Sequence, residues 1–203
     1  MRIHLVRHGH VYNPRHLVYA SLPGFGLSDE GKLQADTVAT HLSTLPIARI
    51  VSSPLDRAVE TATPLAAAVS LPIVVEHDLS EWRLLDRWAG HTWESLDSSF
   101  PTEVAAYLAD PRALTFGEES LDAMAKRCVN AIRRHATNSG DTVFIFHQDP
   151  VQATTRTLLG DSMDDFHGNK PDHVEVRSLT LTPSGWVRTE DPAPSQATPL
   201  PTL

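Results

Sequence analysis

The chain has 203 residues, 41% of them hydrophobic and 21% charged, which suits one globular domain with a sizeable core. Its formal net charge of −8 argues against a general nucleic-acid-binding protein, because such proteins normally carry a basic excess. No stretch approaches the roughly 18 apolar residues of a membrane span, and no signal peptide is apparent. A single cysteine excludes an internal disulfide and a cysteine-rich metal site, so the sequence predicts a cytoplasmic enzyme.

Apolar runs and periodicities predict strands and helices that alternate along the chain. Short apolar runs predict strands at 3–6, 48–51, 73–75 and 142–146, and a closing hairpin formed by 174–181 and 186–189. An irregular stretch that contains three tryptophans is predicted at 82–100. Helices are predicted between Ser28 and Pro46, from Ser53 to Val69, from Pro101 to Leu108, from Ser120 to Ile132 and from Pro150 to Leu159.

Three serines are predicted to cap helices. Ser28 and Ser120 each precede an apolar helical pattern, and Ser53 is followed by Pro54 at the expected first helical position. Cys128 falls on the apolar face of the helix after Ser120. It is therefore predicted to be a core residue and not a reactive thiol.

The alternation of strands and helices predicts an α/β fold with three layers, in which helices cover both faces of a mainly parallel sheet. Residues 1–190 are predicted to form a single domain. Residues 191–203 are rich in proline, alanine, serine and threonine, and they are predicted to be a disordered tail.

Four side chains that could carry chemistry follow predicted strands. Arg7 and His8 end the first strand, Arg57 follows the second, and His147 follows the strand at 142–146. Because the carboxyl ends of parallel strands lie at one edge of a sheet, where ligands bind, we expect these residues to converge. Arginine can grip phosphate in bidentate fashion, and histidine can act as nucleophile, base or metal ligand. Clustered arginines would make a local positive pocket for a small anionic substrate despite the acidic chain.

The order and spacing of several motifs resemble the histidine phosphatase superfamily, often called phosphoglycerate-mutase-like. The resemblance covers nearly the whole globular part and implies a phosphoglycerate-mutase-like fold with no metal or organic cofactor. Asn13-Pro14, the LPGF run at 22–25 and His147-Gln148 most resemble an uncharacterised actinobacterial branch. The motifs are LVRHG at 5–9, LSDEGKLQA at 27–35, SSPLDRAVETA at 52–62 and GEES at 117–120, together with Glu81 and His147.

Phosphoryl transfer needs a nucleophile in line with the phosphorus, neutralised phosphate oxygens and a proton for the leaving oxygen. His8 would take the phosphoryl group as a phosphohistidine, and its neutral form would be favoured by like-charge repulsion from the two arginines. Arg7 and Arg57 would neutralise the phosphate, with His147 as a third donor. The backbone at Gly9 would hold the other ring nitrogen of His8 and would allow a tight turn and a close approach to the ligand.

Glu81 is the predicted proton donor. It would protonate the leaving alkoxide and then, as a carboxylate, activate water to hydrolyse the phosphohistidine. Asp78, Asp86 and Glu94 lie in the same predicted loop region and stay open as alternatives.

Three further positions bear on substrate binding. Asn13 is predicted either to contact the phosphate from the first loop or to serve only as a turn residue before Pro14. Gln148 stands where the family commonly has a small residue, so it would add a donor to the phosphate or narrow the pocket. His10 stands where an acidic residue is common, and this makes the mouth of the site more positive at low pH.

The favoured function is metal-independent hydrolysis of a small phosphorylated metabolite, in the manner of a histidine acid phosphatase. A mutase is the first alternative, but it must keep water from the phosphohistidine, and mutases of this superfamily generally have longer chains with enclosing segments. A catalytically inactive phospho-ligand-binding module is the second alternative. No nucleic-acid or membrane partner is expected, and the oligomeric state is not predicted.

Two sets of residues have a structural and a functional interpretation. Large aromatic residues in the predicted loop region could line the entrance of the site or pack the loop, and packing is the favoured interpretation. These residues are Trp82, Trp88, Trp93 and Phe100. The N-terminal histidines could instead form a zinc site, and they are His4, His8, His10 and His16. This site is disfavoured because the positive charge of Arg7, next to His8, would repel a divalent cation.

Overall fold

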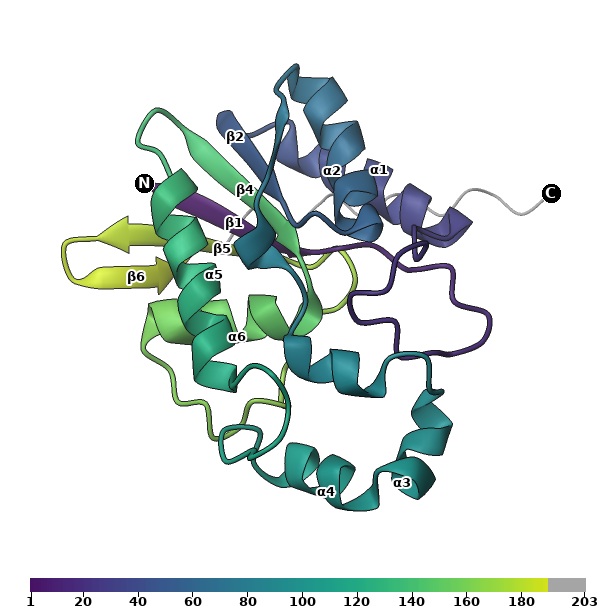
Figure 1. The fold of residues 1–203 in the computed structure, drawn as a ribbon. Coiled ribbons are helices and arrows are strands. Elements are labelled where there is room, and N and C mark those ends of the chain that lie inside the picture. The colour runs from purple at the N-terminus through teal and green to yellow at the C-terminus, as the bar shows by residue number, and fades with distance from the viewer. Residues whose placement is uncertain (190–203) are drawn as a thin grey trace.

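Residues 1–189 are described in a computed structural model; residue 190 and the predicted tail at 191–203 lie outside the described residues. A six-stranded sheet runs through the centre in the order β3-β2-β4-β1-β5-β6 (Figure 1). The first four strands in this order are parallel, and the last two pair antiparallel. The strands are β1 (Arg2–Arg7), β2 (Ile47–Ser52), β3 (Ile73–Val75), β4 (Asp141–Phe146), β5 (Val176–Thr182) and β6 (Gly185–Arg188).

Four longer helices cover the two faces of the sheet. Helices α1 and α2 pack together over one face, and α5 and α6 pack together over the other (Figure 1). They are α1 (Asp29–Leu42), α2 (Asp56–Val69), α5 (Leu121–His135) and α6 (Gln148–Leu159). The stretch from 77 to 109 contains 3-10 turns at His77–Leu79, Arg83–Trp88 and Trp93–Ser95, and the helices α3 (Leu96–Ser99) and α4 (Pro101–Ala109).

The two-residue period of β4 explains the three layers. Val143 and Ile145 lie in the hydrophobic cluster under α1 and α2, whereas Phe144 and Phe146 lie in the cluster under α5 and α6. A strand that is apolar on both sides must be covered on both faces, because successive side chains point in opposite directions. The predicted three-layer α/β fold with a mainly parallel sheet is confirmed.

Two of the three predicted serine caps are confirmed. The hydroxyl oxygen of Ser28 accepts from the backbone N–H of Gly31, and that of Ser120 accepts from Ala123. The prediction for Ser53 is wrong, because α2 begins at Asp56. The backbone N–H of Ser53 bonds to the carbonyl of Ile145, so this residue continues the sheet and does not open the helix.

Close approach of two backbones fixes the loop that leaves β1. A Cβ added to Gly9 would lie 2.8 Å from the carbonyl oxygen of Gly31, so the close approach at Gly9 is to the start of α1. An antiparallel bridge joins Val11 to Leu27, and a second joins Leu17 to Thr92. These contacts hold the loop over the carboxyl edge of the sheet. No helix in the described part of the chain is long and apolar enough to cross a membrane.

Candidate active site

His8 lies just past the end of β1 with both ring nitrogens engaged. Its Nδ1 is 2.8 Å from the carbonyl oxygen of Gly9. Since a carbonyl can only accept, Nδ1 carries the proton and Nε2 keeps its lone pair. The Nε of Arg57 donates toward this Nε2 at 3.3 Å. The ring is therefore held as the neutral tautomer that a nucleophile requires, by the bond expected at Gly9.

The environment of His8 keeps the ring neutral. Burial lowers the pKa of His8 well below its ordinary value, and the charges of Arg57 and Arg7 lower it further. Desolvation is the largest of these causes, ahead of the like-charge repulsion expected from the sequence.

The two arginines are anchored by backbone carbonyls and ring contacts. Arg7 donates from Nη1 to the carbonyl of Pro171 at 2.9 Å and from Nη2 to Nε2 of His173 at 3.0 Å. Arg57 donates from Nη2 to the carbonyl of Ala20 at 2.7 Å, and its guanidinium lies 4.7 Å from the ring centroid of Tyr19. These contacts preorganise two positive charges around His8.

His147 faces the same point from the end of β4. Its ring centroid is 5.3 Å from that of His8, and its Nε2 is 2.7 Å from the hydroxyl of Ser53. Assigning Ser53 as the donor leaves the proton of His147 on Nδ1. That buried nitrogen has no hydrogen-bond partner among the described residues, so it is available to a ligand oxygen. Burial and the charge of Arg57 lower the pKa of His147 well below its ordinary value.

Glu81 is the carboxylate that enters the site from the loop after β3. One oxygen, Oε2, lies 4.0 Å from Nδ1 of His147, and the other accepts from the backbone N–H of Trp82 at 2.8 Å. Only 9% of Glu81 is exposed. The pKa of Glu81 is raised to about 7, first by burial and second by the negative charge of Asp149, while Arg57 opposes both effects. A carboxyl group of this kind can donate a proton near neutral pH.

The three alternative carboxylates are held elsewhere. Asp78 pairs with Arg134, Asp86 accepts from the backbone and hydroxyl of Ser21, and Glu94 lies beside His16 at the surface.

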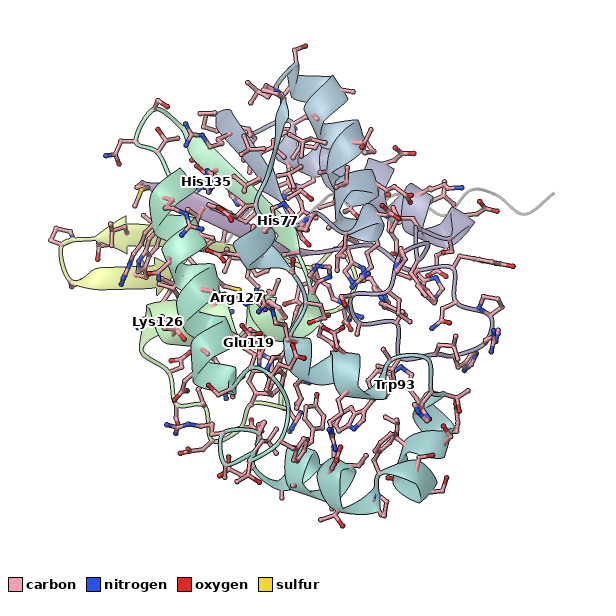
Figure 2. The ribbon with its side chains drawn as sticks, viewed as in Figure 1. His77, Trp93, Glu119, Lys126, Arg127 and His135 are labelled. Carbon is pink, nitrogen blue, oxygen red and sulfur yellow. The ribbon has the colours of Figure 1, made fainter. Side chains whose placement is uncertain are left out.

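The segment that carries Glu81 is braced by a partly buried ion pair, Arg127 with Glu119 (Figure 2). Arg127, on α5, donates from Nη1 to the carbonyls of Asp78 and Ser80 and from Nη2 to that of Glu81. The Nε of Arg127 is 2.6 Å from Oε1 of Glu119. Glu119 of the GEES motif therefore helps to position the backbone at Glu81 by holding Arg127.

Asp149, which the sequence analysis missed, lies beside Glu81. It is 3% exposed and lines the same pocket as His8 and Glu81. Lys170 Nζ is 2.7 Å from its Oδ1, and the hydroxyl of Tyr107 donates to its Oδ2 at 3.2 Å. The sequence offered one signal for Asp149: it lies two residues after His147, near the end of a predicted strand. Its partners Tyr107, on α4, and Lys170, in the loop before β5, are distant in sequence, so no local pattern could predict them.

These residues surround a cavity of about 260 Å³, here called the inner pocket. It brings together Arg7, His8, Glu81, Gln148 and Asp149, with apolar walls from the first loop and from Leu85. The side-chain amide of Gln148 donates to the carbonyl of Pro171 at 3.3 Å. Arg57 and His147 do not line this pocket; both are buried, and each contacts His8.

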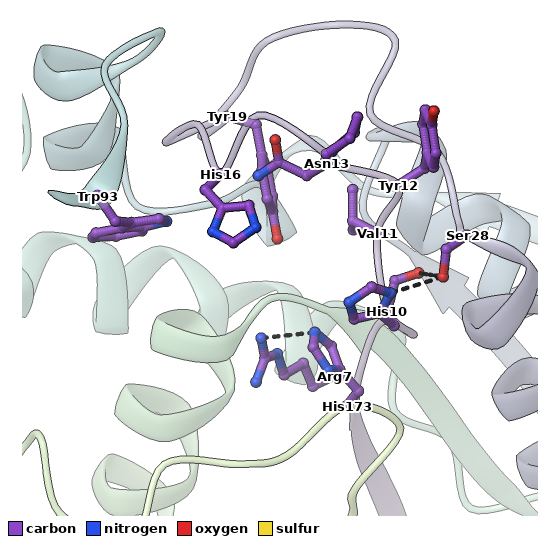
Figure 3. A pocket seen from close by; sticks show the side chains of 11 residues that line it. Arg7, His10, Val11, Tyr12, Asn13, His16, Tyr19, Ser28, Trp93 and His173 are labelled. Atoms are coloured by element: carbon purple, nitrogen blue, oxygen red, sulfur yellow. Dashed lines mark hydrogen bonds between the residues drawn. The ribbon is translucent and has the colours of Figure 1, made fainter. Parts of the chain in front are cut away.

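Figure 3 shows the lining of a second cavity of about 470 Å³, here called the outer pocket. Arg7, Tyr19 and Trp93 line both pockets. Asn13 lines the outer pocket, where its amide bonds the backbone N–H and carbonyl of Leu17. In this structure the side chain of Asn13 therefore stabilises a turn of the first loop. Asn13 does not line the inner pocket.

The remaining candidates occupy different places. Trp82 and Trp88 are buried in the core, whereas Trp93 is 48% exposed and lines both pockets. Cys128 is buried, and burial raises the pKa of its thiol to about 12. His4 bonds Asp141 and Ser178 inside the sheet, away from the loop histidines. Within residues 1–189, no group of three or more His, Cys, Asp or Glu side chains could hold a metal ion.

A buried neutral histidine, two anchored arginines and a protonatable carboxyl at the carboxyl edge of a parallel sheet define a histidine-based phosphoryl-transfer protein. The chain matches the histidine phosphatase superfamily (branch 1) over residues 3–190, and it belongs to that family.

Relatives and solved structures agree with this membership. An uncharacterised protein of Mycobacterium tuberculosis is 34% identical over 161 residues, which cover 78% of this chain and 79% of the relative. Phosphoserine phosphatase 1 of Hydrogenobacter thermophilus is 30% identical over 173 residues, or 82% of this chain and 80% of that protein. The native structure of a mycobacterial glucosyl-3-phosphoglycerate phosphatase superposes with a TM-score of 0.76 at 25% identity, covering 88% of this chain and 89% of that one. The predicted likeness to an uncharacterised actinobacterial branch is thereby confirmed.

Proposed function

We propose that this protein hydrolyses a small phosphomonoester through a phosphohistidine formed on His8, without a metal ion. The observation that carries the proposal is the orientation of His8, whose Nδ1 proton is held by Gly9 and whose Nε2 lone pair faces the guanidinium of Arg57. An imidazole held in this way can attack phosphorus in line and needs no further deprotonation.

The neighbouring side chains supply the remaining chemistry. Arg7, Arg57 and the Nδ1 proton of His147 neutralise the phosphate oxygens as the bond to the leaving oxygen breaks. Glu81, whose pKa of about 7 keeps a large fraction of it protonated at neutral pH, donates its proton to that oxygen. The resulting carboxylate then takes a proton from water, which attacks the phosphohistidine and releases phosphate. A location in the cytoplasm stays a prediction from composition.

The test is release of phosphate from an aryl phosphate between pH 4.5 and 8 with a metal chelator present. We expect turnover by the wild type and a loss of about 10³-fold or more in kcat for His8→Ala, because the covalent path is removed. The surface variant His77→Gln should retain wild-type turnover, since His77 is exposed outside the site.

Each other result has a clear meaning. Equal turnover by wild type and His8→Ala would exclude His8 as the nucleophile. No turnover by the wild type, together with a phosphohistidine detectable by mass spectrometry after incubation with a phosphate ester, would favour a mutase. Absence of both, with phosphate still bound, would favour a binding module.

A further inference from the structure

We propose that His173 is a positioning residue for Arg7: its ring is a neutral acceptor that fixes the direction of the guanidinium without cancelling the positive charge. The inference rests on the proposed function, which places Arg7 on the phosphate. His173 lies in the turn at 171–174 that precedes β5, 166 positions after Arg7 in the chain. No sequence motif predicted a role for it.

Arg7 is held by two acceptors of this turn. Its Nη1 donates to the carbonyl of Pro171 at 2.9 Å, and its Nη2 donates to Nε2 of His173 at 3.0 Å; Figure 3 draws the second bond. A guanidinium has further N–H donors, and one of them, Nε, is buried without a partner among the described residues. Arg7 lines the inner pocket together with His8. The two bonds therefore decide which donors of Arg7 are left for a phosphate.

The ring of His173 can accept from Arg7 only while it is neutral. An arginine donates and cannot accept, so Nε2 of His173 must keep its lone pair and the ring proton must lie on Nδ1. Burial, the charge of Arg7 and the neighbouring His10 lower the pKa of His173 to about 4. His173 is therefore a neutral acceptor near neutral pH.

The turn that carries His173 is clamped to the end of β1. The backbone N–H of Val174 donates to the carbonyl of Arg7 at 3.0 Å, and Val174 has a φ of 52°. A β-branched residue in this left-handed region is strained, and such strain persists only where surrounding contacts impose it. Arg177 supplies one such contact, because its Nη2 donates to the carbonyl of Asn169 at 2.7 Å. The strained turn thus holds its acceptors in place against Arg7.

The acceptors of Arg7 differ in charge from those of two other largely buried arginines. Arg127 pairs with Glu119, and Arg177 pairs with Glu175. Among the described residues, Arg7 forms no ion pair with a carboxylate; its acceptors are a carbonyl and an imidazole. A carboxylate beside the guanidinium would cancel much of its charge and would repel a phosphate. Neutral acceptors fix the direction of Arg7 and keep its charge for the ligand.

The test compares three substitutions of His173 that differ in acceptor and in charge. His173→Leu removes the acceptor, His173→Gln offers a neutral oxygen, and His173→Glu offers a charged oxygen on a side chain of nearly the same shape. We expect kcat/KM for an aryl phosphate at pH 7 to fall about tenfold in the leucine variant, because a hydrogen bond to a charged group is lost. Glutamine should recover most of this loss, and glutamate should recover none of it.

A double-mutant cycle with Arg7→Met separates an effect through Arg7 from a general structural effect. In the Arg7→Met background, His173→Leu should change kcat/KM by less than about twofold, because its target is already absent. Equal losses of kcat/KM in both backgrounds, or a glutamine variant no more active than the glutamate variant, would overturn the proposal. If His173→Leu does not fold, the comparison of glutamine with glutamate carries the test. The exposed-surface variant His77→Gln should match the wild type.

Affinity for inorganic phosphate, measured by calorimetry on the same proteins, keeps this inference separate from the proposed function. The expected order of phosphate affinities, without turnover of the aryl phosphate by the wild type, would reject the hydrolase and keep His173 as the positioning residue. Turnover that requires His8, with equal phosphate affinity and equal kcat/KM in all three His173 variants, would keep the hydrolase and reject the positioning role.

Discussion

At the scale of single residues, the charge of Asp149 adds to burial in raising the pKa of Glu81. That charge, held by Lys170 and Tyr107, is the second cause after burial that raises the pKa of Glu81. Asp149→Asn keeps the shape but removes the charge, so the pKa of Glu81 should fall, by about one unit. Because the proposed mechanism uses the acid form of Glu81, kcat/KM should then decline at a lower pH than in the wild type.

The measurement is the pH profile of kcat/KM together with the carboxyl carbon chemical shift of Glu81 followed by NMR. Asp97→Asn is the matched control, because Asp97 is exposed on α3. An unchanged titration of Glu81 in Asp149→Asn would contradict the expected coupling, whatever the effect of the variant on activity.

Ser53 is a second residue whose role is local. Its hydroxyl fixes the ring of His147, so Ser53→Ala should let the ring adopt other tautomers and orientations. We expect kcat for an aryl phosphate to fall about tenfold, and Ser53→Thr, which restores the hydroxyl, to recover most of it. Failure of threonine to recover activity more than alanine does would argue that the hydroxyl bond is unimportant.

At the scale of elements, α5 positions the loop that follows β3. Arg127 donates to three carbonyls of that loop, those of Asp78, Ser80 and Glu81. Arg127→Met would leave these carbonyls and the partly buried carboxylate of Glu119 without their guanidinium donor. We expect a loss of about 1–3 kcal/mol in the free energy of unfolding, the cost of acceptors left without a partner, and a fall in kcat.

Denaturant unfolding and aryl phosphate turnover would measure both effects. Arg133→Met lies on the exposed side of the same helix and should change the free energy of unfolding by less than about 0.5 kcal/mol. Similar stability losses for the two variants would contradict the bracing role.

At the scale of the whole molecule, the buried histidines make stability depend on pH. The pKa values of His8 and His147 lie well below their ordinary value of 6.5 in the folded protein. Their contribution to the free energy of unfolding is therefore complete above about pH 6.5. It is lost as the pH falls, because histidines in the unfolded chain bind protons at a higher pH than those in the folded protein. Glu81 acts in the opposite sense: its raised pKa destabilises the folded state above pH 4.5, and acidification relieves that cost between about pH 7 and 4.5.

Two histidines outweigh one carboxyl, so the free energy of unfolding should fall by on the order of 2 kcal/mol between pH 6.5 and 5. Urea unfolding at several pH values would measure this slope. The decline should be steeper in Glu81→Gln, which lacks the compensating titration, and unchanged in His77→Gln. Constant or rising stability on acidification would show that the site histidines are not buried in neutral form.

The sequence by itself determined the layers of this protein and predicted much of the candidate site. The apolar run of β4 requires cover on both faces, and Ser28 and Ser120 cap their helices through bonds that span only three residues. Arg7, His8 and Arg57 could be proposed because strand ends in a parallel sheet meet at one edge. These are consequences of local period and of topology.

Only the tertiary structure decided which polar groups meet. Ser53 looked like a helix cap, but α2 begins three residues later at Asp56, and the hydroxyl of Ser53 bonds His147, 94 positions away. Glu81 is buried beside His147, whereas the alternative carboxylates Asp78, Asp86 and Glu94 pair with other residues, and no sequence pattern indicated that difference. Asp149 and His173 owe their places to contacts between distant segments. Hydrogen bonds and charges act through space over a few ångströms, and the order of residues in a chain does not record those distances.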